Sequence, residues 1–556
     1  MLCDFILNLI FLLIFLVITF NDNINILYGL QLNSYSLKSI YFDMYMGFKR
    51  YIIYWVLYVI ICVCFFVLKV CEFWWLLCAE ILMGIILFIL SNKFKNVRKI
   101  KYTKRMIRLI VFSVILLIIE CVLIISFLPI NVSIILLPLS LECSYITISL
   151  SYILLMPVEL LIGKYYITIA KRKLSSNKKL IKVGITGSFG KTSTKEILSS
   201  ILKEEFNVLA TPKSFNTPFG ITKTINEKLD NLSEIFICEM GAKKRGEIKY
   251  LCELVSVDCG IVTSVGRQHT STFGSIENVY KTKNELPNYL FNKMCVFNLM
   301  NHYTFQMYRE YMGEKIGVFL IIKRAIRTTK ILIKRSRKIC KKNNKYIFKL
   351  YEYPKKFNYY AKNIKCTEYG SNFDVYYNDI FLMNVSTELI GIHNIINVLL
   401  AIALAFRLGM KRNNIASGVS KVKQINARLE KRVMPNGAIV LNNGYNSNID
   451  SAKFTIETLK FFNREHKVII TPGLVETEDD YLYNEKFGEM LAKYCTDVVI
   501  VKEKNKGAIL KGLLNAHFDM CNVVSVADFK DAIKIINNAN ENFVFLIEND
   551  LPDNYK

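Results

Sequence analysis

Long hydrophobic runs dominate the first 163 residues, and each is close to the length that a helix needs to cross a bilayer. They lie near residues 5–20, 51–68, 73–90, 109–128 and 133–163. Crossing the hydrocarbon core takes about 20 apolar residues in a helix. The first run lacks a basic segment and a small-residue cleavage site, so we interpret it as a span and not as a signal peptide. The pattern predicts an α-helical transmembrane domain of about five helices at residues 1–163.

Basic residues gather beside the fourth and fifth runs. Residues 93–108 hold eight Lys or Arg and residues 164–182 hold seven, with no acidic residue in either segment. Because basic loops stay on the cytoplasmic side, this distribution places the N-terminus outside the cell and the rest of the chain inside. We therefore predict a multi-pass protein of the cell membrane, with membrane lipid as a partner, its catalytic domains in the cytoplasm and a basic cytoplasmic linker at 164–180.

After Lys182 the pattern changes to short apolar runs that alternate with amphipathic segments. IKVGIT, EIFICEM and CGIVTSV are runs of the first kind, and TKEILSSILKEEF is a segment of the second. This alternation is typical of parallel α/β architecture. A length of 556 residues also exceeds what one hydrophobic core supports, so several domains are expected.

Composition narrows the classes of protein. A mean hydropathy of +0.29 argues against a wholly soluble or disordered chain. The 15 cysteines form no CxxC pair, which favours reduced thiols over a disulfide framework or a zinc site. The net charge of +26 is accounted for by three acid-free segments, the two above and residues 323–345 with eleven bases. The charge therefore reports position along the chain, not a general affinity for nucleic acid.

The basic insert at 323–345 has three interpretations. A solvated loop is the usual state of a charge run. Contact with an anionic lipid leaflet is about equally favoured, because each base near such a surface adds about 1 kcal/mol. Nucleic-acid binding is disfavoured, since the segment has neither interleaved aromatic residues nor a recognition fold, and no nucleic-acid partner is expected.

The strongest chemical signal is the segment TGSFGKTS, which ends at Ser193. It follows the run IKVGI and opens the helical segment TSTKEILSSIL. Glycines there let backbone N–H groups face a phosphate at the positive end of a helix. Lys191 then reaches the terminal phosphates, and the Thr192 hydroxyl can ligate Mg²⁺. The spacing departs from the usual P-loop, because two residues and not four separate the glycines.

Two further strands end in candidate metal ligands. EIFIC is followed by Glu239, and CGIVTSV leads to Gln268 and His269. Open α/β sheets bind ligands at the carboxyl ends of their strands. We therefore expect Glu239 and His269 near the phosphate site.

Together these motifs resemble the Mur ligases, ATP-dependent amide-forming enzymes of peptidoglycan precursor synthesis. The resemblance covers about residues 181–556 and not 1–163. It rests on the ordered segments TGSFGKTSTK, TPKSFNTPFGI, CEMGAKKRGEI, SVGRQHTSTFGSIENVYKTKNEL, FNLMN, GIHNIINVLLAIA and ARLEKR. The fourth of these, together with LNNGYNSNIDS, is most similar to the branch that adds D-alanyl-D-alanine.

The resemblance implies a role for each matching residue. Two Mg²⁺ ions would be held by Thr192, Glu239, His269 and Lys283, where Lys283 matches the family's carbamylated lysine. Catalysis would fall to Lys191, His269 and Lys283. The nucleotide would be bound by Gly187, Ser188, Phe189, Gly190, Lys191, Thr192, Ser193, Asn216, Asn394, Asn397 and Arg428. In the family the two asparagines contact adenine, and the arginine reaches the nucleotide from the last domain.

The same resemblance implies the domain organisation. A central ATP-binding domain with a mostly parallel sheet would occupy 181–425, interrupted by the basic insert, and a Rossmann-like C-terminal α/β domain would occupy 426–556. Two features depart from the family. Asn442 and Asn443 stand where the family has an acidic pair, and a membrane domain replaces the usual N-terminal domain that binds the UDP part of the substrate.

These features predict an ATP-dependent ligase that activates a muramoyl-peptide carboxylate and joins it to D-alanyl-D-alanine or a similar dipeptide or amino-acid amine. A ligase or amidating enzyme for a lipid-linked cell-wall precursor is the first alternative. A non-catalytic membrane nucleotide sensor is the second. The candidate ligands Glu239, His269 and Lys283 favour an enzyme, because a sensor needs neither two metals nor a carbamate.

Overall fold

The computed structural model describes residues 26–31, 35, 101–128, 144–267, 270–321, 358–444, 448–475 and 477–549. The chain forms two compact units, Met1–Tyr165 and Tyr166–Lys556. The predicted runs at 5–20, 51–68 and 73–90 and the basic insert at 323–345 lie outside the described residues.

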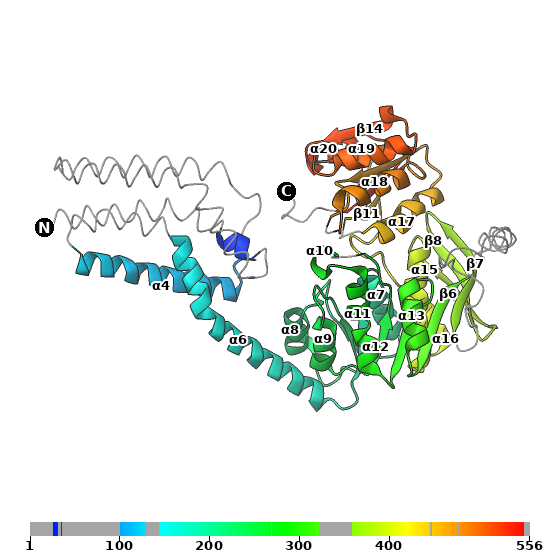
Figure 1. Ribbon diagram of the computed structural model, residues 1–556. Helices are drawn as coiled ribbons and strands as arrows, with labels where there is room; N and C mark the ends of the chain where they lie inside the picture. The colour runs from blue at the N-terminus through cyan, green and yellow to red at the C-terminus, as the bar shows by residue number, and fades with distance from the viewer. Residues whose placement is uncertain are drawn as a thin grey trace, which may run out of the picture. The chain divides into compact units, whose positions relative to one another are not determined.

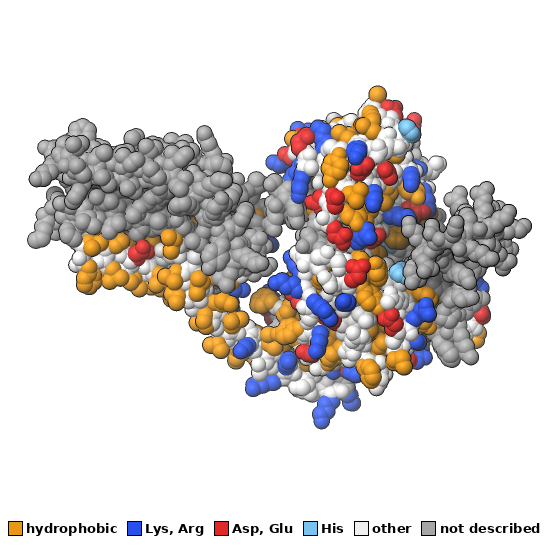
Figure 2. Space-filling view, viewed as in Figure 1, with side chains coloured by type: hydrophobic (Ala, Val, Ile, Leu, Met, Phe, Trp, Pro, Cys, Tyr) orange, Lys and Arg blue, Asp and Glu red, His pale blue; other side chains and the backbone are white. Residues whose placement is uncertain are grey.

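In the first unit, two apolar helices carry most of the described residues. They are α4 (Lys104–Phe127) and α6 (Ser144–Ser176), which runs on into the second unit. Their most apolar windows reach mean hydropathies of 3.1 and 1.9. Exposed aliphatic side chains cover the face of α4 that is in view in Figure 2. Both helices are long and apolar enough to cross a membrane, which is weak evidence by itself, and a five-helix domain stays a prediction.

Polar contacts join these two helices. Arg108 on α4 makes two hydrogen bonds to the Glu159 carboxylate on α6, at 2.6 and 2.8 Å. Nearer the other end of α4, the Thr147 hydroxyl donates to Glu120 at 3.1 Å. Arg108, Glu120 and Glu159 are thus each paired with a partner on the neighbouring helix.

The segment predicted as a basic linker is helical for most of its length, because α6 continues to Ser176. In the second unit, Ala170 and Leu174 of α6 are buried in one cluster with side chains of α8 (Pro218–Lys228). The Lys173 ammonium donates to the Asn226 carbonyl at 2.6 Å. The end of α6 is therefore packed against α8 within the second unit.

A nine-stranded sheet forms the centre of the second unit, in the order β2-β3-β1-β4-β5-β6-β7-β8-β9. The strands from β2 to β7 are parallel, and β7, β8 and β9 are antiparallel. The predicted mostly parallel sheet is confirmed. The strands are β1 (Ile181–Thr186), β2 (Val208–Ala210), β3 (Ile235–Glu239), β4 (Cys259–Val262), β5 (Met294–Asn298), β6 (Lys315–Leu320), β7 (Tyr359–Thr367), β8 (Gly370–Tyr377) and β9 (Ile380–Thr387).

Helices cover both faces of this sheet (Figure 1). On one face lie α7 (Lys191–Leu202), α15 (Ile392–Arg407) and α16 (Arg412–Ser420). The other face packs against α8, α9 (Glu247–Val255), α11 (Ile276–Lys283), α12 (Glu285–Leu290) and α13 (His302–Glu310), with the short α10 (Thr270–Phe273) before α11. Two separate hydrophobic clusters result, which explains the continuous apolar runs of the parallel strands.

The C-terminal domain is a second α/β sandwich with a six-stranded sheet in the order β10-β11-β15-β12-β13-β14. Only the β10–β11 pair is antiparallel among its described strands. The strands are β10 (Glu430–Val433), β11 (Ile439–Asn443), β12 (His466–Thr471), β13 (Asp497–Val501), β14 (Val523–Val526) and β15 (Phe543–Glu548). The helices are α17 (Ile449–Glu457), α18 (Asp480–Leu491), α19 (Lys506–Asn515) and α20 (Phe529–Asn537), with 3₁₀ turns at Thr458–Phe461 and Met520–Asn522.

Candidate active site

The loop between β1 and α7 is shaped by two glycines. Gly187 and Gly190 have φ angles of +149° and +83°. These are values that glycine adopts without steric cost. A Cβ at Gly187 would collide with the Thr263 side chain, and one at Gly190 would press on Asn397. The glycines therefore allow the chain to turn tightly from the sheet into α7.

The loop that follows β4 holds this turn in place. The Ser188 N–H donates to the Ser264 carbonyl at 2.7 Å, and the Phe189 N–H donates to the Ser264 hydroxyl at 3.2 Å. The Thr263 hydroxyl donates to the Phe189 carbonyl at 2.6 Å. Because these two N–H groups are engaged within the protein, the N-terminus of α7, which begins after Gly190, is the part of this turn that could hold an anion.

Lys191 lies at the start of α7 with its ammonium turned toward the loop. It donates to the carbonyls of Gly187 at 2.6 Å and Ser188 at 3.0 Å. Burial lowers the pKa of Lys191 to about 8, while the charge of Glu239 raises it and that of Arg428 lowers it. The structure thus brings Lys191, Glu239 and Arg428 within electrostatic reach of one another, and the half-buried Thr192 stands next along the helix.

Glu239 ends β3, beside the loop between β1 and α7, and is 1% exposed. Its Oε1 accepts from the Asn216 amide at 3.1 Å, and its Oε2 has no hydrogen-bond partner. The ammonium of Lys195 lies 3.7 Å from Oε2 and is itself fully buried. A buried carboxylate oxygen without a hydrogen bond is a suitable ligand for a cation.

Sequence reasoning missed Lys195, although it lies one helical turn after Lys191 in the same motif. Its ammonium donates to the Lys213 carbonyl and lies 3.1 Å from Glu196 Oε1. Lys195 therefore joins α7, the loop that carries Asn216, and β3.

Lys283 is buried at the end of α11, with 4% exposure, whereas Lys281 is exposed. Burial is the main cause that lowers the pKa of Lys283 to about 7, and the charge of Lys191 lowers it further. A large fraction of Lys283 is therefore neutral near physiological pH. His269 lies outside the described residues.

A magnesium ion fits the donors present. The described part of the chain has no group of three or more His, Cys, Asp or Glu side chains placed to hold a metal. Mg²⁺, however, is usually bound by one or two carboxylates together with waters and substrate phosphates. Glu239 and the Thr192 hydroxyl are donors of that kind.

A cavity of about 160 Å³ adjoins the loop between β1 and α7. Its lining includes the predicted residues Phe189, Gly190, Ser193, Asn394, Asn397 and Arg428. The Asn397 amide oxygen accepts from the Thr194 hydroxyl at 3.3 Å, and the ring of Phe454 lies 6.3 Å from that of Phe189. Aromatic walls with a few amide groups suit a flat heterocyclic base.

Sequence reasoning also missed His393, which lines the same cavity. Its Nδ1 atom is buried without a hydrogen-bond partner, and burial lowers the pKa of His393 to about 4. The imidazole is therefore neutral at physiological pH. Its position beside Asn394 in GIHNIIN was the signal that could have identified it.

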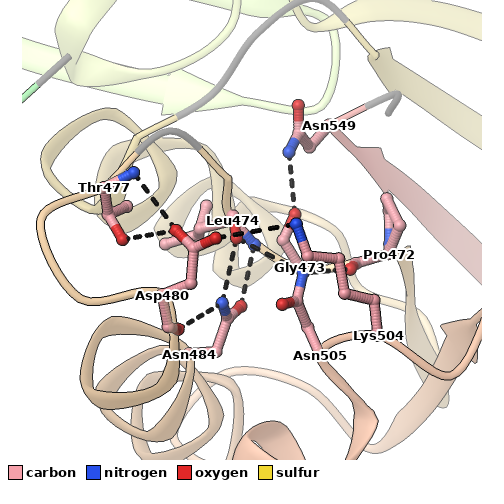
Figure 3. A network of polar contacts seen from close by, with 9 residues as sticks. All are labelled: Pro472, Gly473, Leu474, Thr477, Asp480, Asn484, Lys504, Asn505 and Asn549. Atoms are coloured by element: carbon pink, nitrogen blue, oxygen red, sulfur yellow. Dashed lines mark hydrogen bonds and ion pairs between the residues drawn. The ribbon is translucent and has the colours of Figure 1, made fainter. Parts of the chain in front are cut away.

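Amide side chains form the carboxyl edge of the C-terminal sheet (Figure 3). Asn484 binds both the N–H and the carbonyl of Leu474, at 2.8 and 2.9 Å. Asn505 donates to the Pro472 carbonyl at 2.9 Å, and Asn549 donates to the Gly473 carbonyl at 2.7 Å. These three buried asparagines fix the loop that follows β12.

Comparison with known proteins agrees with this geometry. Residues 185–324 match the family model described as the Mur ligase middle domain. The chain is 27% identical over 308 residues to the UDP-N-acetylmuramoyl-tripeptide–D-alanyl-D-alanine ligase of Buchnera aphidicola, covering 55% of this chain and 60% of that relative. It is 25% identical to the enzyme of the same name from Bacillus subtilis, covering 64% of this chain and 69% of the relative.

The fold is shared with solved structures. The MurF ligase of Thermotoga maritima in complex with ADP superposes with a TM-score of 0.56 at 20% identity, covering 70% of this chain and 80% of that one. The similarity over much of the chain is to enzymes named as ligases, in agreement with the predicted enzyme class. The chain is thus similar to the Mur ligases in sequence and in fold, and residues 185–324 match the model of their middle domain.

Proposed function

We propose that this protein joins D-alanyl-D-alanine to the peptide carboxylate of a UDP-muramoyl tripeptide in peptidoglycan precursor synthesis. The observation that carries the proposal is the convergence of Lys191, Glu239 and Lys283 at one edge of a sheet with the Mur ligase fold. The names of the relatives supply the substrate pair.

The reaction has two steps. The substrate carboxylate attacks the γ-phosphorus of ATP, so that a C–O–P bond forms, the bond to ADP breaks, and an acyl phosphate results. The amine of the dipeptide then attacks the acyl carbon, a C–N bond forms, and phosphate leaves as the amine loses a proton. Activation is required because a free carboxylate and an ammonium group do not condense in water.

The residues at the loop have separate tasks in this proposal. Lys191 offsets the charge that develops on the transferred phosphoryl group, the main contribution that such a site makes. Thr192, Glu239 and His269 would hold Mg²⁺, which neutralises phosphate charge when bound. The cavity formed by Asn394, Asn397 and Arg428 would take the nucleotide base and sugar.

Lys283 would act as a carbamate, because the metal site needs an anion where the sequence supplies a lysine. CO₂ adds only to a neutral amine, and the lowered pKa of about 7 keeps much of Lys283 neutral at physiological pH. Bound Mg²⁺ would favour the resulting anion.

The N-terminal helices would anchor the ligase to the cytoplasmic face of the cell membrane as a multi-pass domain. Support comes from α4 and α6, both long and apolar enough to cross a bilayer, and from the basic residues beside them. This arrangement would keep the soluble domains close to membrane-associated steps of wall synthesis.

The test uses the full chain in detergent with ATP, Mg²⁺, UDP-muramoyl tripeptide and D-alanyl-D-alanine. We expect ADP release that depends on both substrates and a product with the mass of the joined peptide. If the protein turned over only a lipid-linked muramoyl peptide, the proposed substrate would have to be lipid-linked and not nucleotide-linked. ATP binding without ADP release under any combination would identify a sensor and overturn the proposed ligase.

A further inference from the structure

The two asparagines that replace the family's acidic pair have different surroundings. They end β11, where successive side chains point to opposite faces of the sheet. Asn443 is 8% exposed, and its amide donates to Glu548 Oε2 at 2.9 Å. Asn442 is half-buried, and its Oδ1 accepts from the Gly444 N–H at 3.0 Å. Among the described contacts of these two residues, only Asn443 is hydrogen-bonded to a carboxylate, whereas Asn442 stands opposite Glu430 of β10 in the antiparallel register.

That carboxylate belongs to the last residue of the neighbouring strand. In the parallel register of β11 and β15, Asn443 stands directly beside Glu548, which is fully buried. Glu548 Oε2 also accepts from the Thr455 hydroxyl on α17, at 2.9 Å. Asn443 and Thr455 both line the cavity beside the loop between β1 and α7. A buried glutamate thus stands behind two residues of the cavity wall.

We propose that Glu548 is a positioning residue for this cavity, and that it carries the acidic group which the asparagine at 443 lacks. Two carboxylates at hydrogen-bond distance cannot both be ionised without a large cost. A glutamate at 548 therefore requires a neutral donor at 443, and an amide meets that need. In place of the family's acidic residue at position 443 on β11, this chain therefore has its acidic residue on β15.

The position of Glu548 also links the cavity to the rest of the sheet edge. The next residue, Asn549, donates its side-chain amide to Gly473 and its backbone N–H to the Asn443 carbonyl, at 2.7 and 3.2 Å. The end of β15 thus holds the cavity wall on one side and the loop after β12 on the other. A change at 548 is expected to move the wall of the cavity and not a distant surface.

The test compares N443D, E548Q and the double variant N443D/E548Q with the parent, all as full chains in detergent. In the double variant, the amide nitrogen of a glutamine at 548 can take the place of Oε2 and donate to both the new aspartate and the Thr455 hydroxyl oxygen, so the pairing is restored with donor and acceptor exchanged. N442D is the matched control, since it adds the same charge to the same strand but stands opposite Glu430 of β10 and not beside Glu548.

Two measurements are made. Amide hydrogen exchange without nucleotide reports the stability of β11 and β15, and the dissociation constant of MgATP reports the cavity. N443D should speed exchange in both strands and weaken MgATP by about tenfold or more, whereas the double variant should return to within about threefold of the parent, as expected for coupled neighbours. N442D should speed exchange only in β10 and β11, where it stands opposite Glu430, and should leave exchange in β15 and the MgATP dissociation constant as in the parent.

The outcomes are decisive in either direction. A double variant as impaired as N443D, or an N443D variant equal to the parent, would overturn the proposal. The MgATP measurement rests on the proposed function, but the exchange measurement does not. If the parent failed to bind MgATP, the proposed function would fail while exchange in the four variants still decided the role of Glu548.

Discussion

The carboxyl edges of the two sheets are built from different chemistry. At the central sheet, buried and half-buried ionisable groups meet: two lysines have a lowered pKa, and one glutamate oxygen lacks a hydrogen bond. At the C-terminal sheet, three buried amides bind backbone groups, and the Glu548 carboxylate accepts from the Asn443 amide and the Thr455 hydroxyl. The residues compared are Lys191, Lys195, Glu239 and Lys283 on the central edge and Asn443, Asn484, Asn505, Glu548 and Asn549 on the other.

This difference separates function from stability. Buried charges that lack full compensation cost folding free energy, and they persist where a charged ligand completes them. Buried amides that satisfy backbone groups stabilise the fold and need no ligand. Substitutions at the central edge should therefore alter chemistry more than stability, and substitutions at the C-terminal edge should do the reverse.

The largest effect is expected at Lys191. Lys191→Ala removes the cation that faces the transferred phosphoryl group, so ATP turnover should fall by a factor on the order of 10³. Thermal unfolding should change little, because the side chain binds only loop carbonyls among its recorded hydrogen bonds. Lys203→Ala, at an exposed lysine just after α7, is the control and should keep parental turnover. Near-parental turnover in Lys191→Ala would contradict the assignment of the phosphate site.

If Lys283 is the carbamate of the proposed mechanism, Lys283→Ala should lower turnover by a factor on the order of 10², because it removes a metal ligand. Acetate or formate should restore part of the activity by filling the vacated space, whereas neither should rescue Lys191→Ala. Lys281→Ala, two residues away and exposed, is the control. A fully active Lys283→Ala variant would remove the carbamate from the mechanism.

The pH dependence of Lys283 gives a second measurement. Since its folded pKa is lowered to about 7 from 10.5, the neutral amine that CO₂ attacks becomes available as pH rises through about 7. The carbamate signal in ¹³C NMR should increase over that range. The unfolded chain binds this proton more tightly, so the contribution of Lys283 to stability should also rise with pH between about 7 and 10.5.

At the C-terminal edge, Asn484→Ala should act on stability. The fully buried amide binds Leu474 twice, so its removal leaves the Leu474 N–H without this partner and the Leu474 carbonyl with only the 3.3 Å bond from Asn505, at a cost of about 2 kcal/mol. Urea denaturation followed by hydrogen exchange in β12 and α18 measures this loss. Asn515→Ala removes an exposed amide that binds Glu485, and it should change stability far less. Equal losses of stability in the two variants would show that the buried Asn484 amide contributes no more to stability than the exposed Asn515 amide.

The sequence predicts the central edge far better than the C-terminal one. The glycines and Lys191 follow from the demands of a phosphate, and Glu239 from the end of a buried strand. Lys195 was not predicted, because a lysine on a helix is ordinarily solvated and nothing in the local sequence shows that this one is buried against β3. The pairing of Asn443 with Glu548 was also not predictable, since 105 residues separate the partners and only the strand order joins them. The antiparallel strands β7 to β9 were likewise missed.

The smallest expected effect is at His393, where the two edges face one cavity. Burial lowers its pKa from 6.5 to about 4, so between these values the unfolded chain binds a proton that the folded chain does not. Stability should therefore fall as pH drops through this window and be unaffected by His393 above it. His393→Asn should remove part of that decline, measured as the difference between the thermal midpoints at pH 7 and pH 5. His517→Asn, at an exposed histidine, should leave the difference unchanged. An equal decline in His393→Asn and the parent would mean that the cavity does not hold this imidazole in its neutral form.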